Sequence, residues 1–357
     1  MSTVTDPPRP DVRPEPSVRT SDELLPPVTP PTGRFIVQLF VIPAVIVTVI
    51  VLLWLLVAGV VLRRSGNPDE LIRSLSGLSG DRWQNAQQLA DMLRDERYSQ
   101  FKQNKSAAGQ LAQIIQREVT RIERGERLDE KEVTLLMFVA RALGEFHVDV
   151  GLPALLRAAQ MNSSGNEEVL HVRRAAIQAV AVLTSHMQEH DPAWAGEEFD
   201  LEDALLELAE SDERLVRSET AFALGVLGTP RAVEQLAELA HDPYPDARYN
   251  AANALARHDD LRAVGTLAEM LDPAETAGLR YEDDRDVYRF HKRGTILLNA
   301  LSSTERLARA HPEADFRKLV RPLEDLVAAD AETLREAHIE PVFASEAERV
   351  LSHLKSL

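Results

Sequence analysis

"DERLVRSETAFALGVLGTPRAVEQLAELAHD" (residues 212–242) and "PYPDARYNAANALARHDDLRAVGTLAEMLDP" (residues 243–273) align without a gap at a period of 31 residues. Arg217 falls on Arg248, and the dipeptide Ala-Leu at 223–224 falls on Ala-Leu at 254–255. Apolar residues recur at helical spacing in both copies, and Gly, Pro or Asp residues end the helical segments. Each copy therefore predicts a pair of short amphipathic helices.

Weaker copies of the first helix lie on both sides of this pair. They are "LLMFVARALGEF" (135–146), "HVRRAAIQAVAVL" (171–183) and "HKRGTILLNAL" (291–301), and the second places Arg173 44 residues before Arg217. The extra residues of the longer spacings lie in polar segments such as "QMNSSGNEE". Insertions in loops leave the packing of a repeat intact, so these spacings are compatible with a repeat array.

A helix pair of about 30 residues cannot bury its apolar side alone, whereas stacked pairs form a continuous core. We therefore predict an all-α fold, an α-solenoid of helix pairs over residues 81–357. Small residues at 221, 223, 252 and 254 would permit the close helix approach that stacking needs. The segments "DRWQNAQQLADML" and "ASEAERVLSHLKSL" are expected to cap the two ends of the stack.

The pattern Val-Arg-x-x-x-Ala-x-Ala-Leu-Gly-x-Leu-Gly at 216–228 resembles a HEAT repeat, and in particular the short HEAT-like type first described in phycobilisome lyases. Residues 172–273 carry this resemblance. It implies a scaffold that binds proteins, and it leaves open a lyase-like activity on a bilin chromophore. The repeat is shared by many proteins that are not enzymes, so the resemblance alone says little about activity.

Arginine recurs at one position of each repeat, next to acidic turn residues. The resemblance implies that these arginines and aspartates tie neighbouring repeats together, and a ladder that binds phosphate or carboxylate groups is the alternative. The residues concerned are Arg173, Arg217 and Arg248 with Asp212 and Asp246.

In HEAT-like stacks, the helix that begins at Val-Arg lines the concave face. Its solvent-side positions predict a surface for a protein or peptide partner, in which the aromatic pair Phe222 and Tyr249 is a candidate hot spot. The alternative for Phe222 is simple packing between repeats. The predicted surface comprises Arg174, Gln178, Ser218, Phe222, Tyr249 and Asn253.

Catalytic and cofactor signatures are missing from the sequence. It contains no phosphate-binding Gly-rich loop, no nucleophile elbow and no dinucleotide fingerprint. "HMQEH" (186–190) matches the inverted zinc-protease signature, yet no downstream segment offers a clear third ligand. We therefore expect a protein that is not an enzyme, with no catalytic residues, no cofactor and no metal.

The 357 residues carry 57 acidic and 40 basic residues, a net charge of −17, and no cysteine. Affinity for phosphate backbones comes from cationic side chains, so this charge argues against nucleic-acid binding. The lack of cysteine excludes disulfides and thiolate metal sites.

The segment 35–62 contains no charged residue, and as a helix it would be about 42 Å long. That length exceeds the roughly 30 Å of a bilayer core, even if Pro43 bends or shortens the helix. We predict a transmembrane helix at 35–62 after a disordered, Pro-rich tail at 1–34. A juxtamembrane linker at 63–80 follows, with a short helix capped by Asn67.

Positive residues that flank a span favour the cytoplasmic side, and Arg63 and Arg64 follow this segment directly. The sequence thus predicts a single-pass membrane protein with its repeats in the cytoplasm. We expect a non-enzymatic scaffold or adaptor that binds a membrane-associated protein or peptide, and no nucleic acid.

Overall fold

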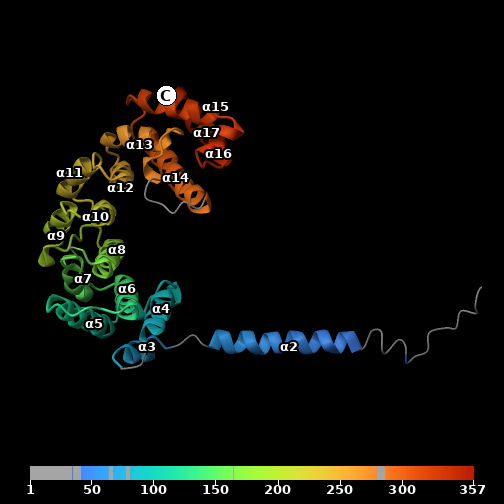
Figure 1. The fold of residues 1–357 in the computed structure, drawn as a ribbon, viewed down its shortest axis with the longest axis vertical. Coiled ribbons are helices and arrows are strands. Elements are labelled where there is room, and N and C mark those ends of the chain that lie inside the picture. The colour runs from blue at the N-terminus through green and yellow to red at the C-terminus, as the bar shows by residue number, and fades with distance from the viewer. Residues whose placement is uncertain (1–33, 35–41, 64–66, 78–80, 164, 280–285) are drawn as a thin grey trace, which may run out of the picture. The chain divides into compact units, whose positions relative to one another are not determined.

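The computed structural model describes residues 34, 42–63, 67–77, 81–163, 165–279 and 286–357. Within these ranges the regular elements are helices and no residue is in a strand (Figure 1), which agrees with the predicted all-α class. The chain divides into two compact units, Met1–Ser65 and Gly66–Leu357, and each is described by itself.

The first unit contributes one long helix, α2 (Ile42–Arg63), whose described side chains run from Ile42 to Trp54 and are exposed. Among the described residues, no helix combines the length and the apolar character that a membrane crossing needs. Residues 35–41 of the predicted span and residues 1–33 of the predicted tail lie outside the described part of the chain.

The second unit contains two rows of helices that alternate along the chain (Figure 1). The inner row, named here for the concave face it was predicted to line, packs in the order α4, α6, α8, α10, α12, α14, and the outer row consists of α5, α7, α9, α11 and α13. The helices are α3 (Pro68–Leu75), α4 (Arg82–Leu93), α5 (Lys105–Glu123), α6 (Glu130–Gly144), α7 (Leu152–Ala159), α8 (Glu167–His190), α9 (Leu201–Ala209), α10 (Arg214–Leu227), α11 (Pro230–Leu239), α12 (Pro245–Arg257), α13 (Val264–Leu271), α14 (Asp286–Ala310), α15 (Arg317–Ala328), α16 (Ala331–Glu336) and α17 (Val342–Ser356).

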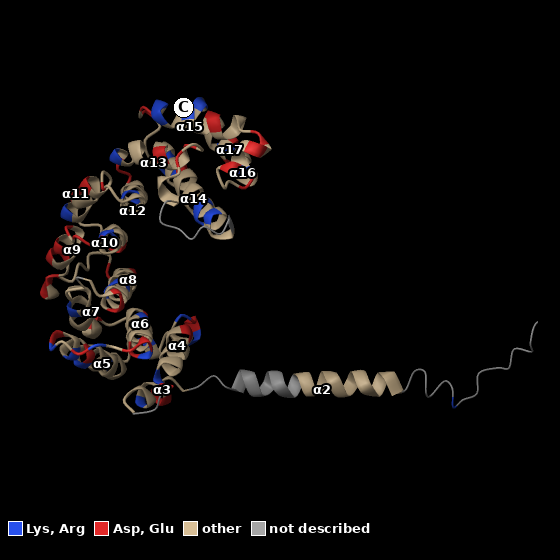
Figure 2. Ribbon diagram, viewed as in Figure 1, with Lys and Arg blue, Asp and Glu red and all other residues tan. Residues whose placement is uncertain are grey.

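The two aligned copies of the sequence form equivalent helix pairs. Residues 212–242 form α10 and α11, and residues 243–273 form α12 and α13. The predicted helix pairs are therefore confirmed, and their stacking in order along the chain is compatible with an α-solenoid. Acidic and basic residues are both spread over the helices of this unit (Figure 2).

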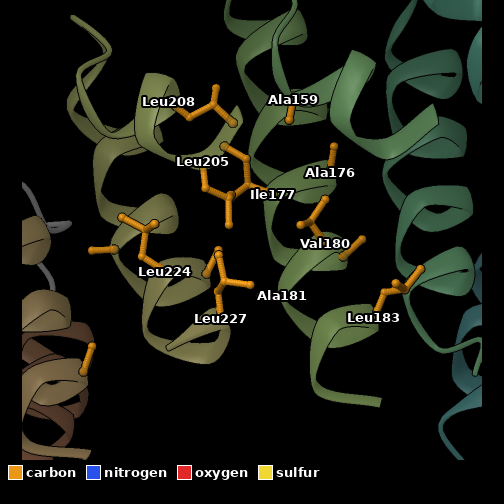
Figure 3. Close-up of a cluster of buried hydrophobic side chains, with 14 of the residues drawn as sticks. Ala159, Ala176, Ile177, Val180, Ala181, Leu183, Leu205, Leu208, Leu224 and Leu227 are labelled. Atoms are coloured by element: carbon orange, nitrogen blue, oxygen red, sulfur yellow. The ribbon is translucent and has the colours of Figure 1, made fainter. Parts of the chain in front are cut away.

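The core is one continuous cluster of buried apolar side chains that runs from repeat to repeat. In Figure 3, Ile177 and Ala181 of α8 lie near Leu205 of α9 and Leu224 and Leu227 of α10. Each of these five residues is at most 4% exposed. Such contacts between neighbouring helices supply the burial that one pair could not reach alone.

Two glycines set the spacing within the inner row. A Cβ atom on Gly144 would lie 2.8 Å from the carbonyl oxygen of Ala179 and 2.9 Å from its Cα atom. A Cβ atom on Gly225 would lie 2.5 Å from the Cβ atom of Ala254. Ala179 and Ala254 each follow the repeated arginine by six residues, so the same pair of positions allows close approach in both places.

The short helix α3 belongs to the second unit and packs against α4 and α5. The side chain of Asn67 accepts a hydrogen bond from the backbone N–H of Asp69, which confirms the predicted N-cap. Ile72 and Leu75 of this helix are buried. Part of the segment predicted as a linker therefore packs with the repeats.

Candidate functional site

The repeated arginines hold the turns that lead into the inner helices. The Nη1 atom of Arg217 lies 2.7 Å from the carbonyl oxygen of Ser211 and 3.2 Å from that of Asp212. The Nη1 atom of Arg248 makes the same bond, at 2.7 Å, to the carbonyl oxygen of Asp242, six residues earlier in the chain. Each guanidinium thus satisfies backbone carbonyls that would otherwise lack a partner at a turn.

Carboxylates fasten two of these arginines to the following segment. Asp242 accepts from both the Nε atom (2.6 Å) and the Nη2 atom (3.0 Å) of Arg217, and Glu269 of α13 accepts from Arg248. The hydrogen bond to Asp242 is the main reason why the pKa of Arg217 is raised. Asp242 is the last residue of the copy that contains Arg217, and its backbone carbonyl oxygen accepts from Arg248 of the next copy, so Asp242 links the two neighbouring repeats.

Arg173 is the variant of this position, since it is buried and bonds to neutral acceptors. Its Nε atom donates to the carbonyl oxygen of Ala159 (2.8 Å) and its Nη1 atom to the hydroxyl of Ser163 (2.6 Å). Burial lowers the pKa of this guanidinium. The three arginines are therefore engaged inside the repeat stack, and this geometry favours the structural interpretation over a ligand-binding ladder.

The aspartates of the predicted ladder have other roles. Asp212 offers its backbone carbonyl oxygen to Arg217, as described above. The carboxylate of Asp246 accepts from the hydroxyl of Tyr244 and from the Nζ atom of Lys292, both at 2.9 Å. Asp242, rather than Asp212 or Asp246, is the carboxylate partner of Arg217.

Four of the six residues of the predicted partner surface reach solvent. Arg174 and Gln178 of α8 are half-buried, and both donate to Glu219 of α10, at 2.7 and 2.9 Å. Phe222 is 39% exposed. Asn253 is half-buried, and its Oδ1 atom accepts from a serine hydroxyl of α14 at 3.1 Å.

The other two residues are buried, which corrects their assignment to the solvent side. Ser218 is 7% exposed, because Asn250 of α12 covers it and donates to its carbonyl oxygen (3.0 Å) and its hydroxyl (3.2 Å). Tyr249 is 4% exposed, and its hydroxyl donates to Glu269 at 2.9 Å. Tyr249 is therefore a core residue, and the expected hot-spot pair of Phe222 and Tyr249 does not form on the surface.

The solvent-facing residues of the inner row form a repeating pattern, which we call the inner stripe. In α10 and α12 the same four positions are exposed or half-buried, separated by the period of 31 residues. In α6 and α8 a set with similar spacing faces solvent. The inner stripe consists of Thr134, Phe138 and Arg141 in α6 with Glu145 at its C-cap, His171, Arg174, Gln178 and Val182 in α8, Leu215, Glu219, Phe222 and Val226 in α10, and Asp246, Asn250, Asn253 and Arg257 in α12.

Histidines gather where α6 and α8 end. The ring of His147 lies 4.7 Å from that of His186 and 5.4 Å from that of His190, measured between centroids, and the Nε2 atom of His186 lies 3.6 Å from Glu145. Burial, followed by the charge of His186, lowers the pKa of His147. In the described part of the chain, no group of three or more His, Cys, Asp or Glu residues is placed to hold a metal ion. The sequence match at 186–190 thus forms an imidazole cluster.

Comparison with known proteins supports the repeat assignment for part of the chain. A family model described as HEAT repeats matches residues 202–282, which run from the second residue of α9 to beyond α13. The resemblance predicted from the sequence is therefore confirmed for this segment. No curated protein matches the chain.

Three of the solved structures that match are distant from this chain in sequence. Two engineered proteins are 16% and 18% identical, with TM-scores of 0.35 and 0.37. The alignments cover 82% and 81% of this chain and 97% and 68% of those chains. Human deoxyhypusine hydroxylase in complex with glycerol is 19% identical over 82% of this chain and 86% of its own, with a TM-score of 0.29. At these scores the likeness supports no argument about function.

Proposed function

We propose that this protein is a membrane-anchored, non-enzymatic scaffold that binds a protein or peptide partner through the inner stripe. The observation that carries this proposal is the repeating, solvent-facing row of mixed apolar and polar side chains on the stacked inner helices. Its centre is Phe222, which is 39% exposed although the chain contains only ten phenylalanines. Exposed aromatic and arginine side chains are the residue types enriched at binding hot spots.

The repeated arginines and the inner stripe have separate roles, which supports this proposal. The repeated arginines Arg173, Arg217 and Arg248 are occupied by turn carbonyls and carboxylates within the stack, so they stabilise the repeats. The inner stripe takes no part in those bonds, so its side chains are not needed to hold the turns that lead into the inner helices. Repeat scaffolds commonly use such a surface for recognition.

The apolar segment 35–62 supports the membrane part of the proposal. The large apolar side chains described in α2 are 48% to 68% exposed, with Trp54 the most exposed. A continuous apolar surface of this kind is stable only where lipid or another protein covers it. We propose that lipid covers it and that Arg63 and Arg64 keep the repeats on the cytoplasmic side.

A photo-crosslinking amino acid at Phe222 tests the partner surface directly. The full chain with this substitution should form adducts with a protein when cells that produce it are irradiated. The matched control carries the same amino acid at Glu238, an exposed position of the outer-row helix α11. If both positions give the same adducts, or Phe222 gives none, the inner stripe is not the binding surface.

Deletion of residues 35–62 tests the anchor. The full chain should sediment with membranes and resist extraction by alkaline carbonate, whereas the deleted chain should stay in the supernatant. Protease added to intact cells should leave the repeats uncut. A full chain that carbonate extracts would refute the anchor and leave the partner surface to be judged by the crosslinks.

A further inference from the structure

A phenylalanine and an arginine lie against each other on the inner stripe where α10 meets α12. The guanidinium carbon of Arg257 lies 5.5 Å from the centroid of the Phe222 ring. The lack of a side chain on Gly225 makes room for this arginine, because a Cβ atom there would lie 2.6 Å from its Nη2 atom. Both Phe222 and Arg257 are exposed, so the pair presents an aromatic face and a positive charge to solvent together.

A second pair of the same kind lies two inner helices earlier. The guanidinium carbon of Arg141 lies 5.3 Å from the centroid of the Phe138 ring, and both residues belong to the α6 part of the inner stripe. Phe138 and Arg141 are half-buried and one helical turn apart. The inner stripe thus carries two aromatic–guanidinium pairs, with α8 between them.

These two guanidiniums differ from the other inner-stripe arginine in lacking an acidic partner. Arg174 is paired with Glu219, whereas no carboxylate or hydrogen-bond acceptor among the described residues binds Arg141 or Arg257. Acidic residues outnumber basic ones in this chain by 57 to 40, so acceptors are not scarce. A guanidinium already held against an aromatic ring and still without a carboxylate is well suited to receive one from outside.

We propose that the inner stripe recognises an acidic segment of a partner protein, in which a carboxylate meets Arg141, another meets Arg257, and apolar side chains contact Phe138 and Phe222. This inference rests on the proposed function and adds the chemistry of the partner. Arg257 belongs to α12, but its guanidinium lies against Phe222 of α10. Neighbouring packed helices are about 9 Å apart, so the guanidiniums of Arg141 and Arg257 are separated by about the α6-to-α10 distance, about 18 Å. An extended chain covers that span in about five or six residues, which sets the separation of the two acidic anchors.

Fluorescent peptides on the full chain in mild detergent test this chemistry. The probes are a series that carries two Glu-Leu dipeptides separated by two to ten residues, and a matched series with Lys-Leu. The Glu series should bind, best at the spacing expected above, and the Lys series should bind at least tenfold more weakly. Arg257→Gln and Arg141→Gln should each weaken binding of the best Glu peptide about tenfold.

Arg321→Gln is the matched control, since it removes the same charge from an exposed arginine of α15, whose Nε atom lies 3.7 Å from a carboxylate oxygen of Asp325. It should leave the affinity unchanged. Equal binding of both series, no binding of any peptide, or equal effects of the three substitutions would overturn the proposal.

Mass-spectrometric mapping of the partner segment crosslinked at Phe222 separates this inference from the proposed function. An acidic segment supports both. A neutral or basic segment overturns the acidic chemistry and leaves the scaffold function standing, and failure of that crosslink removes both.

Discussion

Replacing Gly144 by alanine should weaken the contact between α6 and α8 and destabilise the repeats. The added Cβ atom would lie 2.8 Å from the carbonyl oxygen, 2.9 Å from the Cα atom and 3.1 Å from the Cβ atom of Ala179. Two of these atoms belong to the backbone of α8, so no side-chain rotation can relieve the overlap. The helices must move apart, and their shared core must open with them.

The size of the effect follows from two opposing contributions. Overpacking in a well-filled interior costs about 1–3 kcal/mol. Alanine in place of glycine gains at most about 1 kcal/mol in a helix interior. Gly144 is the last residue of α6, so alanine at this position gains only part of the free energy that it would gain in a helix interior. We expect Gly144→Ala to lower the free energy of unfolding by about 1–2 kcal/mol, after subtraction of this gain.

Gly109 provides the matched control because it lies inside α5 at a position where a Cβ atom would meet no close neighbour. A Cβ atom there would have the Cγ1 atom of Val150, at 3.8 Å, as its nearest neighbour. Gly109→Ala should therefore raise the free energy of unfolding by about 0.5–1 kcal/mol. The assay is urea unfolding followed by circular dichroism, and hydrogen exchange of α6 and α8 locates the change. Stabilisation of both variants would refute the close-approach argument.

Three further predictions follow from single contacts. Asp242→Ala should lower the free energy of unfolding by about 3 kcal/mol, because it leaves the largely buried Arg217 without its carboxylate partner. The control is Asp203→Ala, which removes a carboxylate from an exposed ion pair and should lower the free energy of unfolding by under about 1 kcal/mol. Urea unfolding compares the two variants. Burial lowers the pKa of His147 below its value in the unfolded chain, so the contribution of neutral His147 to stability should be full above about pH 6.5 and be lost as the pH falls through the lowered pKa. Thermal unfolding from pH 8 to pH 5 should show this loss of stability. In His147→Gln, the melting temperature should depend less on pH over the same range. Asn104→Ala should cost about 1 kcal/mol in urea unfolding, since the Asn104 side chain caps α5 by accepting from two backbone N–H groups, both at 3.1 Å.

The repeats could be predicted from the sequence because each depends only on its neighbours. The 31-residue period places α10 with α11 and α12 with α13, as the structure shows, and a polar insertion such as 160–168 changes a turn without changing the stack. The cap at Asn67 was predictable for the same reason, since an N-cap depends on three or four consecutive residues.

The candidate surface could be predicted only in part. The sequence of one helix does not determine which of two adjacent residues is buried by the helix that packs against it. Ser218 and Glu219 precede Phe222 by about one helical turn, so either of them could share its solvent-facing side. Asn250 from α12 covers Ser218, so Glu219 faces solvent. The usable signal was the spacing of four, three and four residues that starts at Leu215 and reaches Val226. Asp242 gave no such signal, since it lies 25 residues beyond Arg217 and the equivalent partner of Arg248 is a glutamate on another element.

The same glycine serves both the stack and the proposed recognition. Gly225 admits Ala254, which fixes the distance between α10 and α12, and it also admits the guanidinium of Arg257 that lies over Phe222. A side chain at this position would displace the arginine and the helix together. The arrangement of the inner stripe is therefore linked to the packing beneath it. The distance between α10 and α12 that closes the core also determines how far the Arg257 guanidinium lies from the Phe222 ring. For this reason Gly225→Ala should weaken peptide binding as well as stability, whereas Gly144→Ala should act on stability first.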